Sequence, residues 1–417
     1  MRSRSVAFTL FAAVSIILAA CSSAATTAPT AAPTAAPTAA PTSAPTAAPT
    51  AAPTAAPTEA PTAAPTAAPT PEASKWVVGV VTDVGTLDDK NFNQFSYEGA
   101  KLGAAAIGAA EPKAIVPASS SEYKTAIQTQ IDQGANIIVT VGFAIGNDTI
   151  AAAQANPNIW FVGVDQGVCL DEAGKVDSTY ACKGVATKLL PNMQGLVFTE
   201  QEPGYLAGVL AACITKTGVI GAIGGTTTIP PVVRYINGYI NGARQYATDN
   251  AKDVKVKTAY ISDDLGKAFN DPAGGKSFAQ QFIKQNKPDI LFQVAGKTGN
   301  GILAAACDAK IYGIGVDVDQ YISTPESQAC ILTSAEKKLQ DAVESAIKKV
   351  SAGQAVGGTQ MQTSRNNGIG LAPYNPAFTP GVITEDCQAA AKTAYFALQA
   401  GLQACDPATC NAPIKGD

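Results

Sequence analysis

Carboxylates are the residues of this 417-residue chain whose types and spacing best suit chemistry, because the chain contains no histidine. Asp83, Asp165 and Asp317 each follow a short apolar run that predicts a β-strand. A carboxylate in such a place can accept hydrogen bonds from a ligand, and two carboxylates can act as acid and base. Histidine is the commonest general base and a favoured metal ligand, so its absence disfavours hydrolases with Ser-His or Cys-His pairs. Ligand binding without reaction is the main hypothesis, and an enzyme that uses Asp83, Asp88 or Asp317 is the alternative.

The elements that must position these carboxylates are predicted to be parallel strands. Apolar runs of strand length occur at residues 76–81, 137–141, 160–164, 219–223, 290–294 and 312–316. Segments with helical spacing lie between them at residues 95–106, 123–133, 203–213 and 232–247. This alternation predicts an α/β fold with parallel sheets and helices on both faces. Ligands bind at the carboxyl ends of strands in such folds, although a turn residue or helix cap is the alternative interpretation of each polar strand end.

The N-terminal segment has the features of a lipoprotein export signal. Residues 1–20 combine a basic start with an apolar run too short to span a membrane comfortably, and Cys21 follows at the expected cleavage point. This context resembles a lipobox, in which the cysteine receives a lipid and becomes the mature N-terminus. We therefore expect a lipid-anchored protein on the extracytoplasmic face of the cell membrane, with an ordinary cleaved signal peptide as the alternative. Residues 21–74 would form a disordered linker of Ala, Pro and Thr, which lacks the large apolar residues needed to fold.

Charge and cysteine content restrict the classes of partner and bound group. The formal net charge is −4 and no basic run occurs, so nucleic acid is not an expected partner. Nine cysteines less Cys21 leave eight, and an even number in an exported chain predicts disulfides. Local bridges are expected for the close pairs Cys169/Cys182 and Cys405/Cys410, and next for Cys307/Cys330. Zinc is the alternative, but without histidine or a Cys-x-x-Cys spacing we predict no metal and no cofactor.

A series of short motifs along the chain resembles those of one known family. The opening motif spans residues 82–94 and contains Asn91-Phe92-Asn93. The motifs that follow in family order are Asn147 with 159–165, 202–208, 229–234 with 237–239, 269–272, 295–301, 315–320 and 332–334. Each motif is weak by itself, but the ordered set covers about residues 77–350. The chain is thereby similar to the basic membrane protein family, also called PnrA-like after a purine nucleoside receptor.

The resemblance implies an α/β fold of the type I periplasmic-binding-protein class. Two Rossmann-like lobes with parallel sheets would be joined by three crossings, with a ligand cleft between them. Lobe 1 would comprise residues 75–197 plus about 337–353, and lobe 2 residues 198–336 plus about 354–417. Members of this class close over a ligand and hand it to an ABC permease in the membrane. The chain is therefore expected to be a monomeric solute-binding protein and not an enzyme.

The resemblance also implies an aromatic clamp. Nucleoside-binding members of the family stack a purine between two rings, and Phe92 and Phe269 match those positions. Stacking suits a flat, polarisable base. Plain core packing is the alternative interpretation of each ring. Gly296 lies in a turn where the absence of a side chain would let backbone groups approach the ligand.

Polar contacts to the ligand are implied at five further positions. Asp317 and Lys337 match the carboxylate and the cation that bind the ribose hydroxyls, and a charged acceptor makes the stronger hydrogen bonds. Asp83, Asn93 and Asp165 match polar contacts to the base or the ribose. Together these residues predict capture of a purine nucleoside. The alternatives are another flat heterocycle such as riboflavin, or a receptor that senses its ligand without transport.

The chain departs from the family pattern in two places near the predicted site. Family members commonly carry apolar residues before the lysine, whereas Glu336 stands there in this chain and Lys338 follows as an alternative cation. Residues 263–267 look like an insertion that would displace the ring of Phe269. Two glycine-rich segments, 218–224 and 274–277, are not predicted to bind phosphates, because neither lies at a turn between a strand and a helix. The segment after Asn366 has no clear family counterpart.

Overall fold

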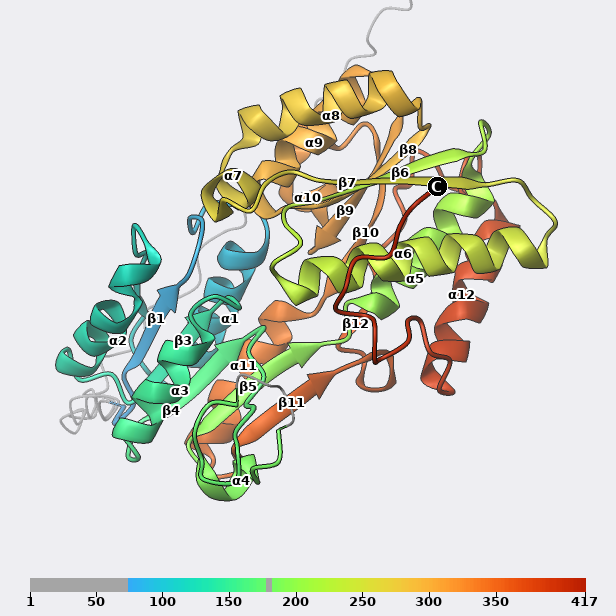
Figure 1. Ribbon diagram of the computed structural model, residues 1–417. Helices are drawn as coiled ribbons and strands as arrows, with labels where there is room; N and C mark the ends of the chain where they lie inside the picture. The colour runs from blue at the N-terminus through green and yellow to red at the C-terminus, as the bar shows by residue number, and fades with distance from the viewer. Residues whose placement is uncertain (1–73, 178–181) are drawn as a thin grey trace, which may run out of the picture. The chain divides into compact units, whose positions relative to one another are not determined.

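The computed structural model describes residues 74–177 and 182–417, so the predicted signal peptide, Cys21 and the linker before Ser74 lie outside the described residues. Two six-stranded sheets, each with helices on both faces, form the described part of the chain (Figure 1). The predicted α/β class is therefore confirmed. Within the described residues, no helix is both long and apolar enough to cross a membrane.

The first sheet is entirely parallel and has the strand order β11-β5-β4-β3-β1-β2. Its strands are β1 (Val78–Thr82), β2 (Lys113–Ile115), β3 (Ile137–Val141), β4 (Trp160–Val164), β5 (Met193–Phe198) and β11 (Gly358–Gln362). One face packs on α1 (Phe92–Ala106) and α11 (Leu339–Ser351), the other on α2 (Tyr123–Asp132) and α3 (Gly146–Ala155). Val80 and Val81 of β1 belong to the cores on opposite faces. Because both faces are covered, the central strands are apolar throughout, as parallel strands commonly are.

The second sheet repeats this plan with the order β12-β10-β9-β8-β6-β7, in which only β12 is antiparallel. Its strands are β6 (Val219–Gly224), β7 (Lys255–Tyr260), β8 (Ile290–Val294), β9 (Tyr312–Asp317), β10 (Ile331–Lys337) and β12 (Ile369–Leu371). One face packs on α5 (Gln201–Ile214), α6 (Pro230–Asp249) and α12 (Glu385–Gln399), the other on α8 (Pro272–Asn286) and α9 (Gly296–Asp308). The two glycine-rich segments lie within β6 and α8, and neither forms a phosphate-binding turn. The shorter helices are α4 (Ala186–Leu189), α7 (Leu265–Asn270), α10 (Gln320–Ser323), η1 (Ser120–Glu122), η2 (Pro325–Ser327) and η3 (Ser364–Asn366).

Three crossings in the described part of the chain join the two lobes, after β5, after β10 and after β11. Hydrogen bonds tie the crossings together: Thr199 N donates to Gln362 O (3.0 Å), and Lys338 N donates to Gly368 O (2.9 Å). The lobe boundary predicted near residue 353 is too early, since β11 belongs to the first sheet. Three of the five residues of this edge strand are polar, and only Gly358 is buried, so no apolar run marks the strand in the sequence.

Four disulfides lie within the described residues. Three are the pairs that the sequence analysis favoured: Cys169–Cys182, Cys307–Cys330 and Cys405–Cys410. The fourth, Cys213–Cys387, bridges 174 residues and joins α5 to α12. The segment after β12 is thereby fastened covalently to the second lobe, with a second disulfide in the tail that follows α12.

Candidate functional site

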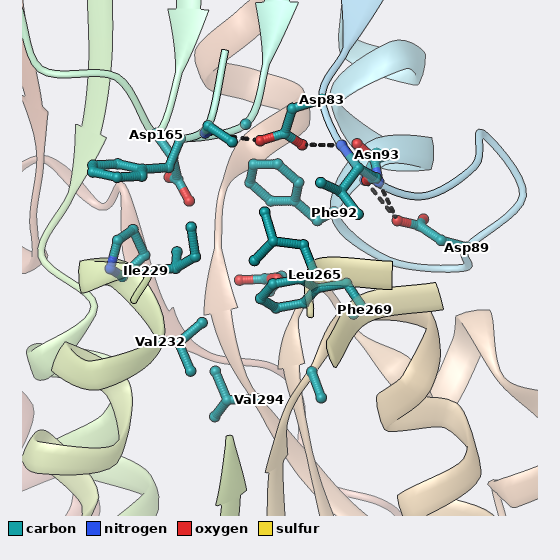
Figure 2. A pocket seen from close by; sticks show the side chains of 18 of the residues that line it. Asp83, Asp89, Phe92, Asn93, Asp165, Ile229, Val232, Leu265, Phe269 and Val294 are labelled. Atoms are coloured by element: carbon teal, nitrogen blue, oxygen red, sulfur yellow. Dashed lines mark hydrogen bonds between the residues drawn. The ribbon is translucent and has the colours of Figure 1, made fainter. Parts of the chain in front are cut away.

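A single cavity collects the predicted ligand-binding residues of both lobes. All eight of them line it: Asp83, Phe92, Asn93, Asp165, Phe269, Gly296, Asp317 and Lys337. Figure 2 shows Asp83, Asp165 and Phe92 on one side of the cavity and apolar side chains of the second lobe, Ile229, Val232, Phe269 and Val294, on the other. The structure thus brings together residues that are separated by up to 254 positions in the sequence, from Asp83 to Lys337.

Strand ends supply the carboxylates of the cavity. Asp83 follows β1, Asp165 follows β4 and Asp317 is the last residue of β9. Asp165 and Asp317 both have a left-handed backbone, with φ of 60° and 65°. This conformation is unfavourable for most residues with a side chain, and its cost is typically tolerated where a side chain must be aimed at a ligand. The carboxyl ends of both sheets therefore face the cavity, as the α/β fold predicts.

The carboxyl group of Asp83 is held by the backbone of its own loop and of the neighbouring one. Its Oδ1 accepts from Val84 N and its Oδ2 accepts from Ala144 N at 3.0 Å. Gly142, with φ of +113°, makes room for it, since a Cβ there would lie 2.0 Å from the carboxyl group. Burial raises the pKa of Asp83 to about 7, against which the backbone hydrogen bonds act only in part. Asp83 can therefore change its protonation state near neutral pH.

The raised pKa of Asp83 predicts a pH-dependent stability. The folded pKa of about 7 exceeds the ordinary 3.8, so the folded state binds the proton more tightly than the unfolded state does. The stabilisation is complete below about pH 4 and is lost as the pH rises through about 7. Between about pH 5.5 and about pH 8 we expect the free energy of unfolding to fall by about 2 kcal/mol more in the wild type than in Asp83→Asn, measured by urea titration. Asp88→Asn, whose carboxylate is 81% exposed, should keep the wild-type slope.

Two aromatic rings and a set of aliphatic side chains form the apolar part of the cavity. Phe92 is the first residue of α1, and Phe269 lies in α7. Leu265 begins α7 four residues before Phe269, so both side chains occur on one face of that helix. In Figure 2 Leu265 is drawn between the two rings, and further aliphatic contacts come from Ile229, Val232 and Val294. The predicted insertion does not remove Phe269 from the cavity; instead it contributes Leu265 to the wall.

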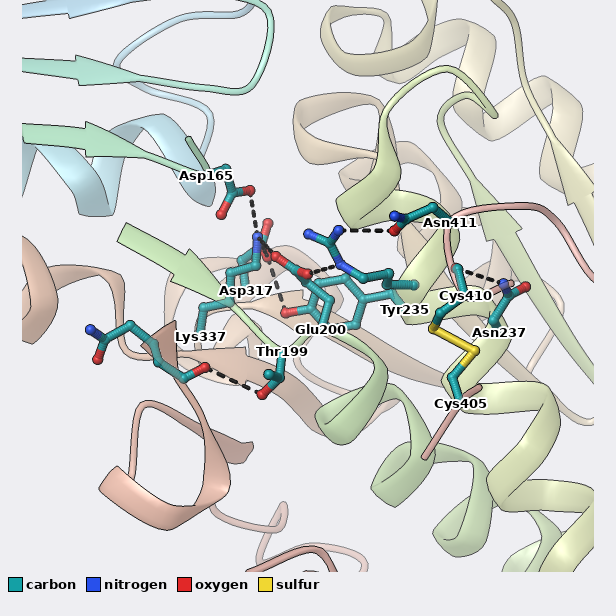
Figure 3. A network of polar contacts seen from close by, with 12 residues as sticks. Asp165, Thr199, Glu200, Tyr235, Asn237, Asp317, Lys337, Cys405, Cys410 and Asn411 are labelled. Atoms are coloured by element: carbon teal, nitrogen blue, oxygen red, sulfur yellow. Dashed lines mark hydrogen bonds and ion pairs between the residues drawn. A yellow bond between two sulfur atoms is a disulfide. The ribbon is translucent and has the colours of Figure 1, made fainter. Parts of the chain in front are cut away.

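The ammonium group of Lys337 is the centre of a buried charge cluster (Figure 3). Its Nζ lies 2.6 Å from Asp165 Oδ2, 3.1 Å from Glu200 Oε1 and 3.8 Å from Asp317 Oδ1, and the side chain is only 2% exposed. Aromatic rings surround the same ammonium, with centroid distances of 5.3 Å for Phe92, 5.3 Å for Phe198 and 5.6 Å for Tyr235. Lys338, the alternative cation, is 41% exposed and pairs with Glu336 outside the cavity.

The protonation of this cluster follows from burial and from the two cations. Burial raises the pKa of Asp317 to about 7 although Lys337 opposes the shift, and it raises the pKa of Asp165 as well. Burial also acts to raise the pKa of Glu200, but Arg234 and Lys337 together hold it below its ordinary value. The pKa of Lys337 lies above its ordinary value, because the three carboxylates outweigh its burial. Glu200 and Lys337 are thus the fixed charges, and Asp317 is the group poised to titrate.

Two remaining predicted residues shape the cavity in different ways. Asn93 donates from Nδ2 to Val84 O (2.9 Å) and to Asp89 Oδ2 (3.0 Å). Its buried Oδ1 has no hydrogen-bond partner among the described residues, so it is an acceptor available to a ligand. Gly296 starts α9 with a left-handed backbone (φ +50°), directly beside the backbone and ring of Phe269. Asp165 Oδ1, like Asn93 Oδ1, is buried and has no hydrogen-bond partner in the described part of the chain.

Three residues of the cluster were not assigned a role by the sequence. Glu200 is fully buried and its Oε2 accepts from Arg234 Nε at 2.6 Å. Tyr235 donates from its hydroxyl to Asp317 Oδ1 at 3.2 Å. Arg234 ends a motif that the resemblance included and Tyr235 directly follows it, but a motif does not say which charge its arginine contacts. Glu200 could have been selected as a polar residue after a strand, since it comes shortly after β5, much as Asp83 comes after β1. The strand β5 itself was not predicted because Gln194 and Gly195 interrupt its apolar run.

Contacts beside the cavity also join the two lobes. Lys297 of α9 forms an ion pair with Asp88 at 2.8 Å, and Asn300 Nδ2 donates to Asp89 O at 3.0 Å. Ser323 Oγ of α10 donates to Lys90 O at 2.8 Å. These bonds hold the loop between β1 and α1 against the second lobe. They support a cleft whose walls are brought together by closure of the two lobes.

The cavity combines groups that are suited to binding a small molecule. Flat apolar matter can pack against the rings, and hydroxyl groups can donate to buried carboxylate oxygens. Within residues 74–177 and 182–417, no group of three or more potential metal ligands occurs. The arrangement therefore suits a small molecule that has a flat ring at one end and hydroxyl groups at the other.

Comparisons with known proteins assign the chain to a family. The family model described as "ABC transporter substrate-binding protein PnrA-like" matches residues 76–387. The nucleoside-binding protein BmpA of an ABC transporter of Lactococcus lactis subsp. cremoris is 29% identical over 306 residues, covering 69% of this chain and 79% of its own length. Basic membrane protein A of Borreliella burgdorferi is 30% identical over 263 residues, covering 62% of this chain and 68% of that protein.

Solved structures with the same fold include solute-binding proteins of ABC transporter systems. The one from Aeropyrum pernix K1 superimposes with a TM-score of 0.66 and 23% identity, covering 81% of this chain and 95% of that chain. The one from Conexibacter woesei has a TM-score of 0.55 and 20% identity, covering 78% of this chain and 98% of that chain. The predicted two-lobed binding-protein fold is thereby confirmed.

Proposed function

Because the chain belongs to the PnrA-like family of ABC transporter substrate-binding proteins, we propose that its ligand is a purine nucleoside, captured in the cavity between the lobes. The observation that carries the proposal is the division of one cavity into an aromatic part and a charged part. Phe92 and Phe269 belong to the first, and Asp165, Asp317 and Lys337 to the second. A nucleoside has the same division, with a flat base at one end and vicinal hydroxyl groups at the other.

The base is placed against the aromatic part. Phe92 is available for this contact because it is only partly buried without a ligand, and Lys337 lies 5.3 Å from the centroid of its ring. Stacking on such a ring contributes about 1–3 kcal/mol per base. Asn93 Oδ1 and the titrating carboxyl group of Asp83 can then meet the polar edge of a purine.

The ribose is placed against the charged part. Vicinal hydroxyl groups can donate to the ionised Asp317, while Lys337 can donate to a hydroxyl oxygen. Asp165 Oδ1 supplies another unpartnered acceptor. An analogue without hydroxyl groups would leave Asp165 Oδ1 without a hydrogen-bond donor and should bind more weakly.

The remaining parts of the function follow from the family and from the export signal. The protein would be held at the outer face of the membrane by a lipid on Cys21 and would act as a monomer. It would release the nucleoside to an ABC permease and perform no reaction on it. The name of the Lactococcus relative, a nucleoside-binding protein, supports the same ligand class.

The aromatic contact is tested by titrating guanosine into the full chain and two variants at Phe92. Phe92→Ala is expected to weaken binding by about 5- to 150-fold, the equivalent of the stacking energy, while Phe92→Tyr keeps a ring and should stay within about threefold of the wild type. Unfolding midpoints of the three proteins control for misfolding. Equal affinities of the alanine variant and the wild type would contradict stacking of the base on Phe92.

A further inference from the structure

Glu200 and Arg234 form a buried ion pair behind the ligand cavity, and neither residue lines that cavity. The side chain of Glu200 is 0% exposed and that of Arg234 is 19% exposed, with 2.6 Å between Oε2 and Nε. The other oxygen of Glu200 lies 3.1 Å from Lys337 Nζ. Glu200 follows the strand that leads into the first crossing, and Lys337 ends the strand that leads into the second. Through Glu200, the pair therefore contacts Lys337 at the place where the crossings join the two lobes.

A count of charges shows what Arg234 does for Lys337. Three buried carboxylates, Asp165, Glu200 and Asp317, face the single ammonium of Lys337. Arg234 supplies a second cation, which pairs directly with Glu200 and also helps to lower the pKa of Asp165 from a greater distance. Without it, Glu200 would compete for Lys337, and Asp165 and Asp317 would lose part of the positive charge that keeps them ionised. Removal of both Arg234 and Glu200 would restore the original balance of charge between Lys337 and the two aspartates.

The C-terminal tail (residues 400–417) covers the outer side of this pair. Asn237 lies one turn after Arg234 on α6, and its Nδ2 donates to Cys410 O at 2.9 Å and to Ala412 O at 2.8 Å. Asn411 Oδ1 accepts from an Arg234 guanidinium nitrogen at 3.1 Å. Figure 3 shows Asn411 between Asn237 and the charge cluster, with the Cys405–Cys410 disulfide beside it. The tail follows the last residue matched by the family model, Cys387.

We propose that Glu200 and Arg234 are positioning residues for ligand binding, which reserve the charge of Lys337 for the cavity, and that the tail holds Arg234 in place through Asn411. The inference rests on the proposed nucleoside site. A buried ion pair seldom stabilises a fold more than an apolar pair of similar volume does, so stability alone gives no reason for two charges here. An electrostatic effect on Lys337 in the cavity does give a reason for the two charges.

The test is a double-mutant cycle on guanosine affinity, measured with the full chain over about pH 6 to about pH 8. Arg234→Gln should weaken binding roughly tenfold near pH 7 and move the pH midpoint of binding upward. Glu200→Gln should move the midpoint downward, because one carboxylate fewer then shares Lys337, and the double variant should return to about the wild-type affinity and midpoint. A merely structural pair would also be rescued by the second deletion, but its loss would not move the pH midpoint of binding. Additive losses in the double variant, or an unchanged midpoint in Arg234→Gln, would therefore overturn the positioning role.

The role of the tail has its own pair of asparagine variants, one in the tail and one at the far end of α6. Asn411→Ala should weaken guanosine binding about two- to threefold and shift the pH midpoint in the direction of Arg234→Gln. Asn250→Ala removes an exposed amide that donates to Tyr246 O at the end of α6. This variant should leave the guanosine affinity and the pH midpoint unchanged. Equal affinities for Asn411→Ala and the wild type would overturn the part assigned to the tail.

The inference can fail separately from the proposed function. If the wild type binds no nucleoside, the ligand assignment fails, and the charge argument is then tested in the unliganded chain by carbon NMR titration of aspartate carboxyl groups. Arg234→Gln should raise the pKa of Asp317, and the double variant should reverse that change. Asp317→Asn identifies the signal. An unchanged pKa of Asp317 in Arg234→Gln would overturn the inference.

Discussion

Lys337→Met is expected to lower the free energy of unfolding by about 3–5 kcal/mol, the loss typical of a buried ion pair from which one partner is removed. Methionine preserves the length of the side chain, but three carboxylates are left around it without the ammonium that lies 2.6–3.8 Å from them. Protonation of Asp165 and Asp317 can relieve part of this loss. The destabilisation should therefore be larger near pH 8 than near pH 5.5, measured by urea unfolding.

The neighbouring lysine is the matched control for this experiment. Lys338 is 41% exposed and, among residues 74–177 and 182–417, forms an ion pair only with Glu336. Lys338→Met should change the free energy of unfolding by no more than about 0.5 kcal/mol. Similar losses for the two methionine variants would contradict the charge cluster as the structure describes it.

Asp317→Asn is expected to weaken purine nucleoside binding by about a hundredfold. The substitution removes a charged acceptor from a buried position, and a hydrogen bond to a charged group is worth about 1.5–3 kcal/mol. The loss should be confined to the ribose, so the variant should bind inosine and 2′,3′-dideoxyinosine almost equally, whereas the wild type should prefer inosine. Asp319→Asn is the control, because Asp319 accepts from Tyr321 N at the start of α10 and does not line the cavity.

The same residue predicts how nucleoside affinity depends on pH. Burial raises the pKa of Asp317 to about 7, and in the proposed complex the ribose hydroxyl groups bind its ionised form. Ligand binding must therefore be accompanied by loss of the proton, and affinity rises with pH through about 7. Between about pH 6 and about pH 8 we expect a roughly tenfold increase in the wild type. Asp317→Asn should lack most of that increase, and a wild-type affinity independent of pH would exclude this role of Asp317.

The sequence was sufficient for the strands that carry the site. β1, β3, β4, β8 and β9 are buried on both faces, so their apolar runs are continuous and the polar residues at their ends stand out. Asp83, Asp165 and Asp317 could be selected on that basis. Phe92, Phe269 and Lys337 could not, because no periodicity distinguishes a ligand-facing ring from a core ring; they depended on the resemblance.

Long-range pairing is what the sequence did not predict. Glu200, Arg234 and Lys337 come from three different elements, and their ion pairs depend on how two lobes meet at the crossings. Cys213 and Cys387 are likewise 174 residues apart, too far for spacing to suggest a bridge. β11 was missed for a local reason, since an edge strand with polar residues has no apolar run.

The two-lobed arrangement also explains why binding and closure belong together. Asp165 lies in the first lobe, Asp317 in the second, and Lys337 between them at a crossing. A ligand can donate hydrogen bonds to both carboxylates at once only when the two lobes are close together. The ion pair of Lys297 with Asp88 is exposed and adds little by itself. The free energy for closure should therefore come mainly from the ligand.

The measurement that tests the central claim most directly is isothermal titration of the full chain, freed of any co-purified ligand, with guanosine, inosine, adenosine, uridine and riboflavin. The nucleoside assignment predicts one site per chain that binds the purine nucleosides and gives much weaker or no heat with riboflavin. Binding of riboflavin alone would replace the nucleoside by another flat heterocycle. Silence from every nucleoside would contradict the proposed function and leave the family and the fold as they stand.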